Sequence, residues 1–100
     1  MRLKESAQLM IYCPRCGNHV NEYNWTLETA SKFSVDGKTT PTVIYVLLQL
    51  ADHNQEWENF RVVCPRCHET IPIKQLPPLE RQQLEDYARE VGEAYVNFNY

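Results

Sequence analysis

The chain has 100 residues, of which 43% are hydrophobic and 11% aromatic, and its net charge is −3. The length suits one domain whose stability would gain from a bound metal, and the composition excludes a disordered chain. No apolar run reaches the roughly 20 residues of a membrane-spanning helix and no secretory signal precedes Cys13, so we expect no membrane contact and a cytoplasmic, reducing location.

The charges are unevenly distributed along the sequence. Basic and acidic residues balance from residue 1 to Pro78, whereas the segment after Pro78 is acidic. This distribution does not resemble the basic surface of a protein that binds nucleic acid mainly through phosphates.

All four cysteines lie in two Cys-Pro-Arg-Cys turns, which we call the first knuckle (residues 12–17) and the second knuckle (residues 63–68). Two such pairs are typical of a structural zinc site with four thiolates, here Cys13, Cys16, Cys64 and Cys67. Two disulfides in a secreted chain are the alternative, and a redox Cys-x-x-Cys would need only one pair. The missing secretory signal and the matching turns favour zinc.

Strands are predicted for the middle of the chain. Apolar residues alternate from Tyr23 to Leu27 and again at Phe33 and Val35, which is the period of half-buried strands. Asp36-Gly37 predicts a tight turn with positive φ angles. The β-branched and aromatic residues 42–48 predict a return strand, and so a β-hairpin over about residues 32–50.

The second half is predicted to contain a loop, a strand and helices. Residues 51–59 are polar and predict a loop, and residues 60–63 predict a short strand. Residues 68–73 predict the beginning of a helix that Pro72 disturbs. After Pro78, apolar residues at spacings of three and four predict an amphipathic helix of about 18 residues.

These elements give two parts. Residues 1–78 are the predicted zinc-binding domain, and residues 79–100 are a helix that packs on this domain or on a partner. A monomer and a homodimer formed through the C-terminal helix both remain open.

The second knuckle is preceded and followed by polar residues in a specific order: Asp52-His53, then Asn59, then His68. On these residues the segment 12–73 resembles the HNH endonuclease family, because the nine-residue step from Asn59 to His68 matches the family's spacing. The resemblance implies an α+β fold, namely a zinc-stapled treble-clef, HNH-like ββα domain with an N-terminal β-hairpin and a C-terminal amphipathic helix.

The same resemblance implies a metal-dependent phosphodiesterase that nicks or cleaves DNA. Asp52 and His68 would hold a second divalent metal such as magnesium, manganese or nickel, and His53 would be the base that deprotonates water. Asn59 would orient the histidine or fix the loop.

Two departures from the family pattern favour an alternative. The first is the loop between His53 and Asn59, which is shorter than usual. The second concerns the motif His-His-Ile-Asp-Gly-Asn of many members. When its Asp and its Asn are aligned with Asp52 and Asn54, Leu50 occupies the position of the base. The alternative is a non-catalytic zinc-binding module, for example a phage or mobile-element accessory or inhibitor protein, that binds protein or nucleic acid.

The knuckles also carry one arginine each. Arg15 and Arg66 lie at the tips of the two turns, where a guanidinium could meet a phosphate. Two arginines alone are weak evidence for such binding.

Overall fold

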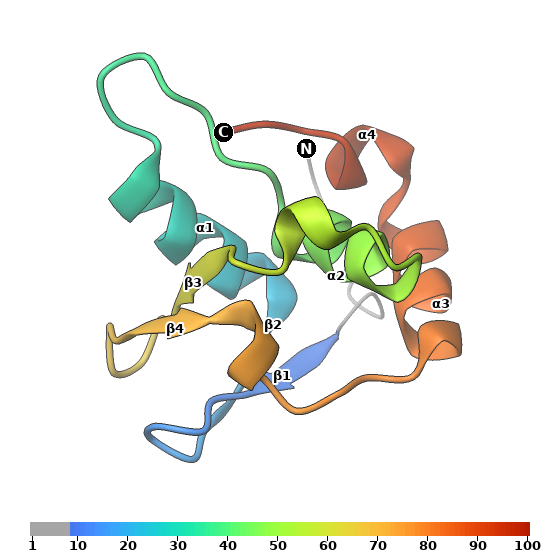
Figure 1. The fold of residues 1–100 in the computed structure, drawn as a ribbon, viewed down its shortest axis with the longest axis horizontal. Coiled ribbons are helices and arrows are strands. Elements are labelled where there is room, and N and C mark those ends of the chain that lie inside the picture. The colour runs from blue at the N-terminus through green and yellow to red at the C-terminus, as the bar shows by residue number, and fades with distance from the viewer. Residues whose placement is uncertain (1–8) are drawn as a thin grey trace.

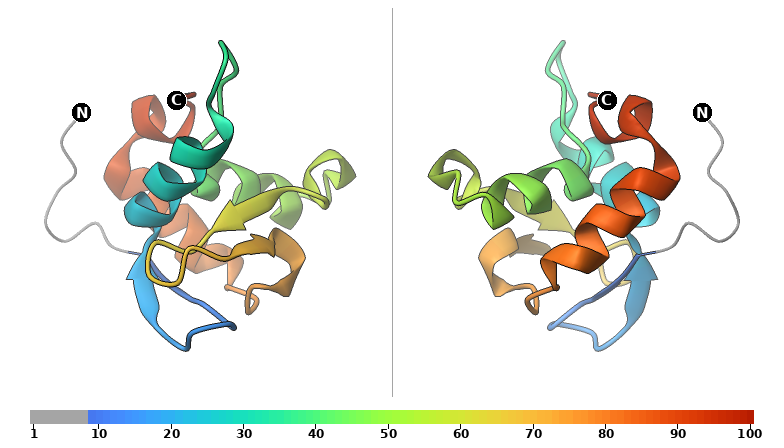
Figure 2. Two further views of the ribbon diagram at one scale, coloured as in Figure 1. Left: turned by 90° about the vertical axis from the view of Figure 1, so that its left-hand side faces the viewer. Right: turned by 90° about the vertical axis from the view of Figure 1, so that its right-hand side faces the viewer.

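The structure is a computed structural model that describes residues 9–100 (Figure 1). It is an α+β fold in which two small antiparallel sheets lie on one side of a group of helices (Figure 2). The strands are β1 (Met10–Tyr12), β2 (His19–Asn21), β3 (Arg61–Val63) and β4 (Thr70–Pro72). The helices are α1 (Glu22–Phe33), α2 (Val43–Ala51), α3 (Arg81–Val91) and α4 (Glu93–Val96), with the short 3₁₀ helices η1 (Gln55–Trp57) and η2 (Ile73–Gln75).

Each sheet is a single hairpin that carries one knuckle at its turn. Ile11 pairs with Val20 between β1 and β2, and Val62 pairs with Ile71 between β3 and β4. All four of these side chains are buried, because alternate residues of each strand face the helices. The strand predicted over residues 60–63 is confirmed as β3.

The β-hairpin predicted over residues 32–50 is wrong, because this part of the chain contains the end of α1 and the whole of α2. Both helices begin at capping side chains: Asn21 accepts the backbone N–H of Asn24, and Thr42 accepts that of Tyr45. The strands predicted for residues 23–27 and 42–48 are also wrong, since α1 contains the first segment and α2, with its N-cap Thr42, the second.

The predicted Asp36-Gly37 turn is confirmed, although it joins two helices rather than two strands. Asp36 and Gly37 have φ angles of 53° and 81°, and Lys38 donates its backbone N–H to the carbonyl of Val35 over 3.0 Å. Beyond the turn, Thr40 and Tyr100 exchange two backbone hydrogen bonds of 2.9 Å, which hold the C-terminal segment against this loop.

The last third of the chain departs from prediction at two places. The helix predicted to begin at His68 is wrong, since β4 occupies residues 70–72. The C-terminal helix begins as α3 and is broken at Gly92, whose φ of 90° lies outside the helical region.

The core has two clusters. One joins the hairpins to α1 and α2 and includes Ile11, Cys13, Trp25, Val43, Val62, Cys64 and Ile71. The other joins α2 to α3 and α4 and consists of Leu9, Ile44, Leu84, Tyr87, Tyr95 and Val96. Among the described residues, no helix is long and apolar enough to cross a membrane.

Candidate metal centre

The two knuckles have the same backbone hydrogen bonds. In the first, Gly17 donates its N–H to the carbonyl of Cys13 over 2.9 Å; in the second, His68 donates to Cys64 over 2.9 Å. Gly17 and His68 both have positive φ angles, 78° and 61°. His68 therefore occupies the position that glycine occupies in the first knuckle.

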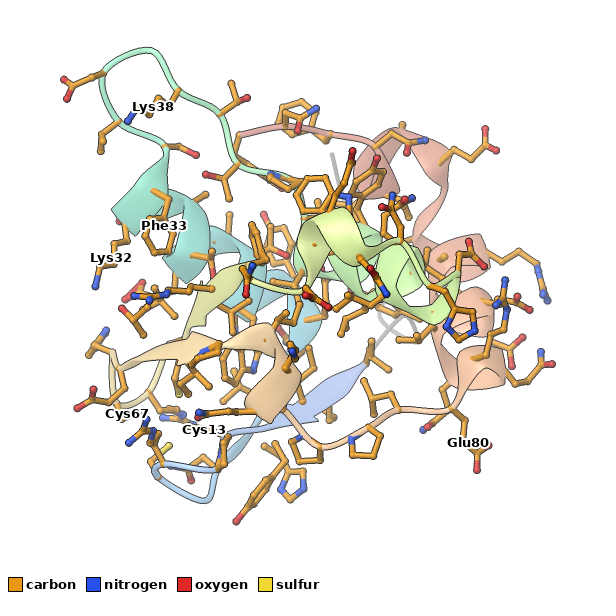
Figure 3. All side chains as sticks on the ribbon, in the orientation of Figure 1. Cys13, Lys32, Phe33, Lys38, Cys67 and Glu80 are labelled. Atoms are coloured by element: carbon orange, nitrogen blue, oxygen red, sulfur yellow. The ribbon has the colours of Figure 1, made fainter. Side chains whose placement is uncertain are left out.

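The fold brings the four cysteine sulfurs together, as predicted. Their Sγ atoms all lie within 4.8 Å of one another, and the pairs Cys13–Cys67 and Cys16–Cys64 are 3.8 Å apart. Figure 3 shows Cys13 and Cys67 side by side where the two hairpins meet.

These distances match a four-coordinate metal rather than disulfides. Sulfurs bound at about 2.3 Å to one tetrahedral zinc ion are about 3.8 Å apart, whereas a disulfide is about 2.05 Å long. The cysteine tetrad can therefore hold a metal ion such as zinc.

Hydrogen bonds and burial act on the thiols in opposite directions. Hydrogen bonds from the backbone and side chain of Asn18 lower the pKa of Cys16 to about 6. Burial raises the pKa of Cys13, Cys64 and Cys67 above their ordinary value. A divalent cation at the centre would supply the charge that keeps the buried sulfurs as thiolates.

Asp52 and His53 form the end of helix α2. His53 donates its N–H to Leu50 over 3.0 Å and Asn54 donates to Gln49 over 2.9 Å, which is the Schellman pattern of a helix C-terminus. His53 has a φ of 62° as the residue that follows the C-cap. The carboxylate of Asp52 pairs with Arg81 of α3.

His68 and Asn59 lie elsewhere. The Nδ1 atom of His68 is 2.6 Å from Oε1 of Glu28, which ties the second knuckle to α1. Asn59 is exposed in the turn that leads into β3. Across residues 9–100, the four cysteines are the one group of three or more His, Cys, Asp or Glu side chains placed closely enough to share a metal, so Asp52, His53 and His68 are not brought together.

Sequence reasoning missed the buried carboxylate of Glu22. Its Oε1 accepts the hydroxyls of Tyr87 (2.8 Å) and Tyr95 (2.7 Å). Its Oε2 accepts the hydroxyl of Thr26 (2.7 Å) and the backbone N–H of Ile44 (2.8 Å) in the first turn of α2. One side chain of α1 thus joins α2, α3 and α4. The only sequence signal was the helix-capping Asn21 before it.

The chain was compared with protein-family models, curated proteins and solved structures, and none of them matches it.

Proposed function

We propose that the chain is a non-catalytic zinc-binding module, in which four thiolates fix the two hairpins so that their surface can bind a partner. The reducing cytoplasm is the setting in which these thiolates would stay available for zinc. The backbone conformation of His53 is the observation that carries this proposal.

A φ of 62° is a conformation that glycine adopts far more easily than histidine. When the HNH motif His-His-Ile-Asp-Gly-Asn is aligned so that its Asp and its Asn match Asp52 and Asn54, His53 aligns with the glycine and Leu50 aligns with the base. The left-handed conformation of His53 supports this register. Leu50 lines an apolar groove of about 270 Å³ beside η2 and α3, and a leucine side chain cannot take a proton from water.

Asp52 and His68, the two proposed ligands of a second metal, already have partners. Asp52 pairs with the guanidinium of Arg81, and His68 is hydrogen-bonded to Glu28. A second metal ion would have to break both contacts and bring together a helix end and a knuckle. This arrangement favours binding over catalysis.

An HNH-like, treble-clef endonuclease is the second candidate. The Asn59 to His68 spacing and the paired knuckles favour it. In that case Asp52 and His68 would hold a second ion such as magnesium, manganese or nickel, with His53 as the base and Asn59 as the orienting residue.

Metal content and cleavage, measured on the same protein, separate the two candidates. We expect one zinc ion per chain by mass spectrometry after dialysis against manganese, and plasmid that stays intact with magnesium, manganese or nickel. A second bound ion together with cleavage that His53→Ala abolishes would overturn the proposal. Cleavage that survives His53→Ala would indicate a contaminating nuclease. The cleavage assay is then repeated with protein from which that nuclease has been removed.

A further inference from the structure

We propose that the outer face of the β1–β2 hairpin, together with the arginines of both knuckles, binds single-stranded nucleic acid. This inference rests on the proposed function, since it names the partner of the binding module. We call this surface the knuckle face and define it by Met10, Tyr12, Arg15, His19 and Arg66.

The hairpin presents an aromatic pair to solvent. Ile11 and Val20 point into the core, so Met10, Tyr12 and His19 point outward. Met10 is 45% exposed and Tyr12 is 38% exposed, and the two lie on the same face of β1 because they are two residues apart.

The two rings contact each other across the hairpin. Tyr12 and His19 are direct cross-strand neighbours, and their ring centroids are 5.0 Å apart at an angle of 55°. The hydroxyl of Tyr12 lies 3.8 Å from the place where a side chain on Gly17 would begin, so the ring reaches back over the knuckle. Exposed aromatic rings of this kind can stack on any base without sequence preference.

The two hairpins carry more cations than acids. Residues 9–21 and 61–75, which contain both hairpins, hold the cations Arg15, Arg61, Arg66 and Lys74 and a single acid, Glu69. None of these cations forms an ion pair within the described part of the chain, whereas Arg81 and Arg89 of α3 both do.

The two hairpins together keep a net positive charge when the metal is bound. Arg15, Arg61, Arg66 and Lys74, less Glu69, leave three positive charges, whereas a divalent ion with four thiolates carries two negative charges. The acidic α3 lies across the molecule, as the positions of Glu80 and of Cys13 and Cys67 in Figure 3 show. Phosphates would therefore be attracted to the hairpins and repelled from α3.

A surface with both aromatic rings and arginines suits a ligand with both bases and phosphates, because the rings can stack on the bases and the arginines can contact the phosphates. An acidic peptide would use the arginines but would gain little from the rings, and a duplex would hide its bases from them. The observations therefore favour a single strand over both.

Fluorescence anisotropy of a labelled oligothymidylate of about 12 nucleotides tests this inference on the zinc-loaded chain. We expect Tyr12→Leu to weaken binding about tenfold, because a leucine keeps apolar area but loses the stacking ring. The double variant Arg15→Gln, Arg66→Gln should make the slope of log K against log salt concentration shallower by about 1.4, because two phosphate contacts are lost.

Two variants serve as matched controls. Phe98→Leu removes an aromatic side chain that is 49% exposed, from the C-terminal segment, which Figure 1 draws at the opposite end of the molecule from β1. Lys38→Gln removes a cation from the 34–40 loop, which lies far from Cys13 and Cys67 in Figure 3. Zinc content and circular dichroism confirm that each variant is folded, and both controls should bind like the parent chain.

The inference is overturned if the oligothymidylate does not bind, if the same strand in a duplex binds as tightly, or if Phe98→Leu weakens binding as much as Tyr12→Leu. The inference is also overturned, in favour of an acidic peptide, if polyglutamate with the same number of charges displaces the oligothymidylate. The recovered oligonucleotide is run on a denaturing gel: cut strands would contradict the proposed function, whereas intact but unbound strands would contradict only this inference.

Discussion

Two histidines with left-handed backbones are held there by the structure around them. His53 closes α2 and His68 closes the second knuckle, with φ angles of 62° and 61°. A non-glycine residue in this region costs about 1 kcal/mol or more. Both positions therefore store strain that a glycine would release.

His53→Gly should raise the free energy of unfolding by about 1 kcal/mol, because His53 is exposed and its backbone strain disappears. Urea unfolding measures this change. His68→Gly is the matched comparison and should gain less, since it also loses the 2.6 Å contact with Glu28. A loss of stability in His53→Gly would show that the imidazole makes a contact of its own.

Glu22 is a fully buried carboxylate that accepts four hydrogen bonds. Glu22→Gln should lower the free energy of unfolding by about 2–4 kcal/mol, because an amide has one acceptor oxygen in place of two and turns a donor toward other donors. Glu90→Gln, on the exposed side of α3, is the control and should change little. Equal urea midpoints for both variants would contradict this role.

At the scale of elements, α3 and α4 are attached to α1 through two phenols. Burial first, and the nearby Glu22 carboxylate second, raise the pKa of Tyr87 and Tyr95 well above the ordinary value. Both phenols therefore keep their protons in the folded chain at pH values where the unfolded chain loses them.

Stability should accordingly be independent of these tyrosines below about pH 10 and fall above it. Above that pH the unfolded state binds fewer protons than the folded state, so the free energy of unfolding drops by up to about 1.4 kcal/mol per pH unit for each phenol. Urea midpoints between about pH 9 and pH 11 measure the slope. Tyr95→Phe should make the slope shallower, while Phe98→Leu, which removes no phenol, should leave the slope unchanged.

The elements also show which parts of the fold could be predicted from sequence. The cysteine tetrad, β3 and the Asp36-Gly37 turn were predicted because each rests on local chemistry. Helix α1 was missed because its buried side includes Glu22, Thr26 and Thr29, and polar residue types hide a helical period. Helix α2 was missed because it is apolar on nearly all sides, although Thr42 was available as a start signal.

Only the four cysteines of the candidate site could be predicted from the sequence. Cysteine spacing alone indicates a metal centre, whereas the partners of Asp52 and His68 come from α3 and α1, which are distant in sequence. No local pattern shows that a carboxylate or an imidazole is already engaged across the fold.

At the scale of the whole molecule, the candidate metal centre is part of one of the two core clusters. Cys13 and Cys64 are buried in the same cluster as Trp25. Zinc binds small four-ligand sites with about 10–16 kcal/mol, which is comparable to the whole stability of a typical domain.

A strong chelator should therefore abolish the near-ultraviolet circular dichroism of Trp25 and much of the helical signal, and Cys64→Ser should have the same effect. Added zinc should restore the signals in the parent chain but not in Cys64→Ser. Unchanged spectra and melting temperature after chelation would exclude a structural metal.

The separation of the ligands along the chain sets when the metal can bind. Cys13 and Cys67 are 54 residues apart and Cys16 and Cys64 are 48 apart, so each hairpin alone offers an ion only two sulfurs. Contacts between residues so far apart carry a larger loop-closure entropy than contacts within one hairpin, and proteins rich in such contacts fold more slowly. Tight capture of an ion by all four sulfurs would therefore wait until the two hairpins meet, and the rate of metal uptake by a refolding chain would report that step.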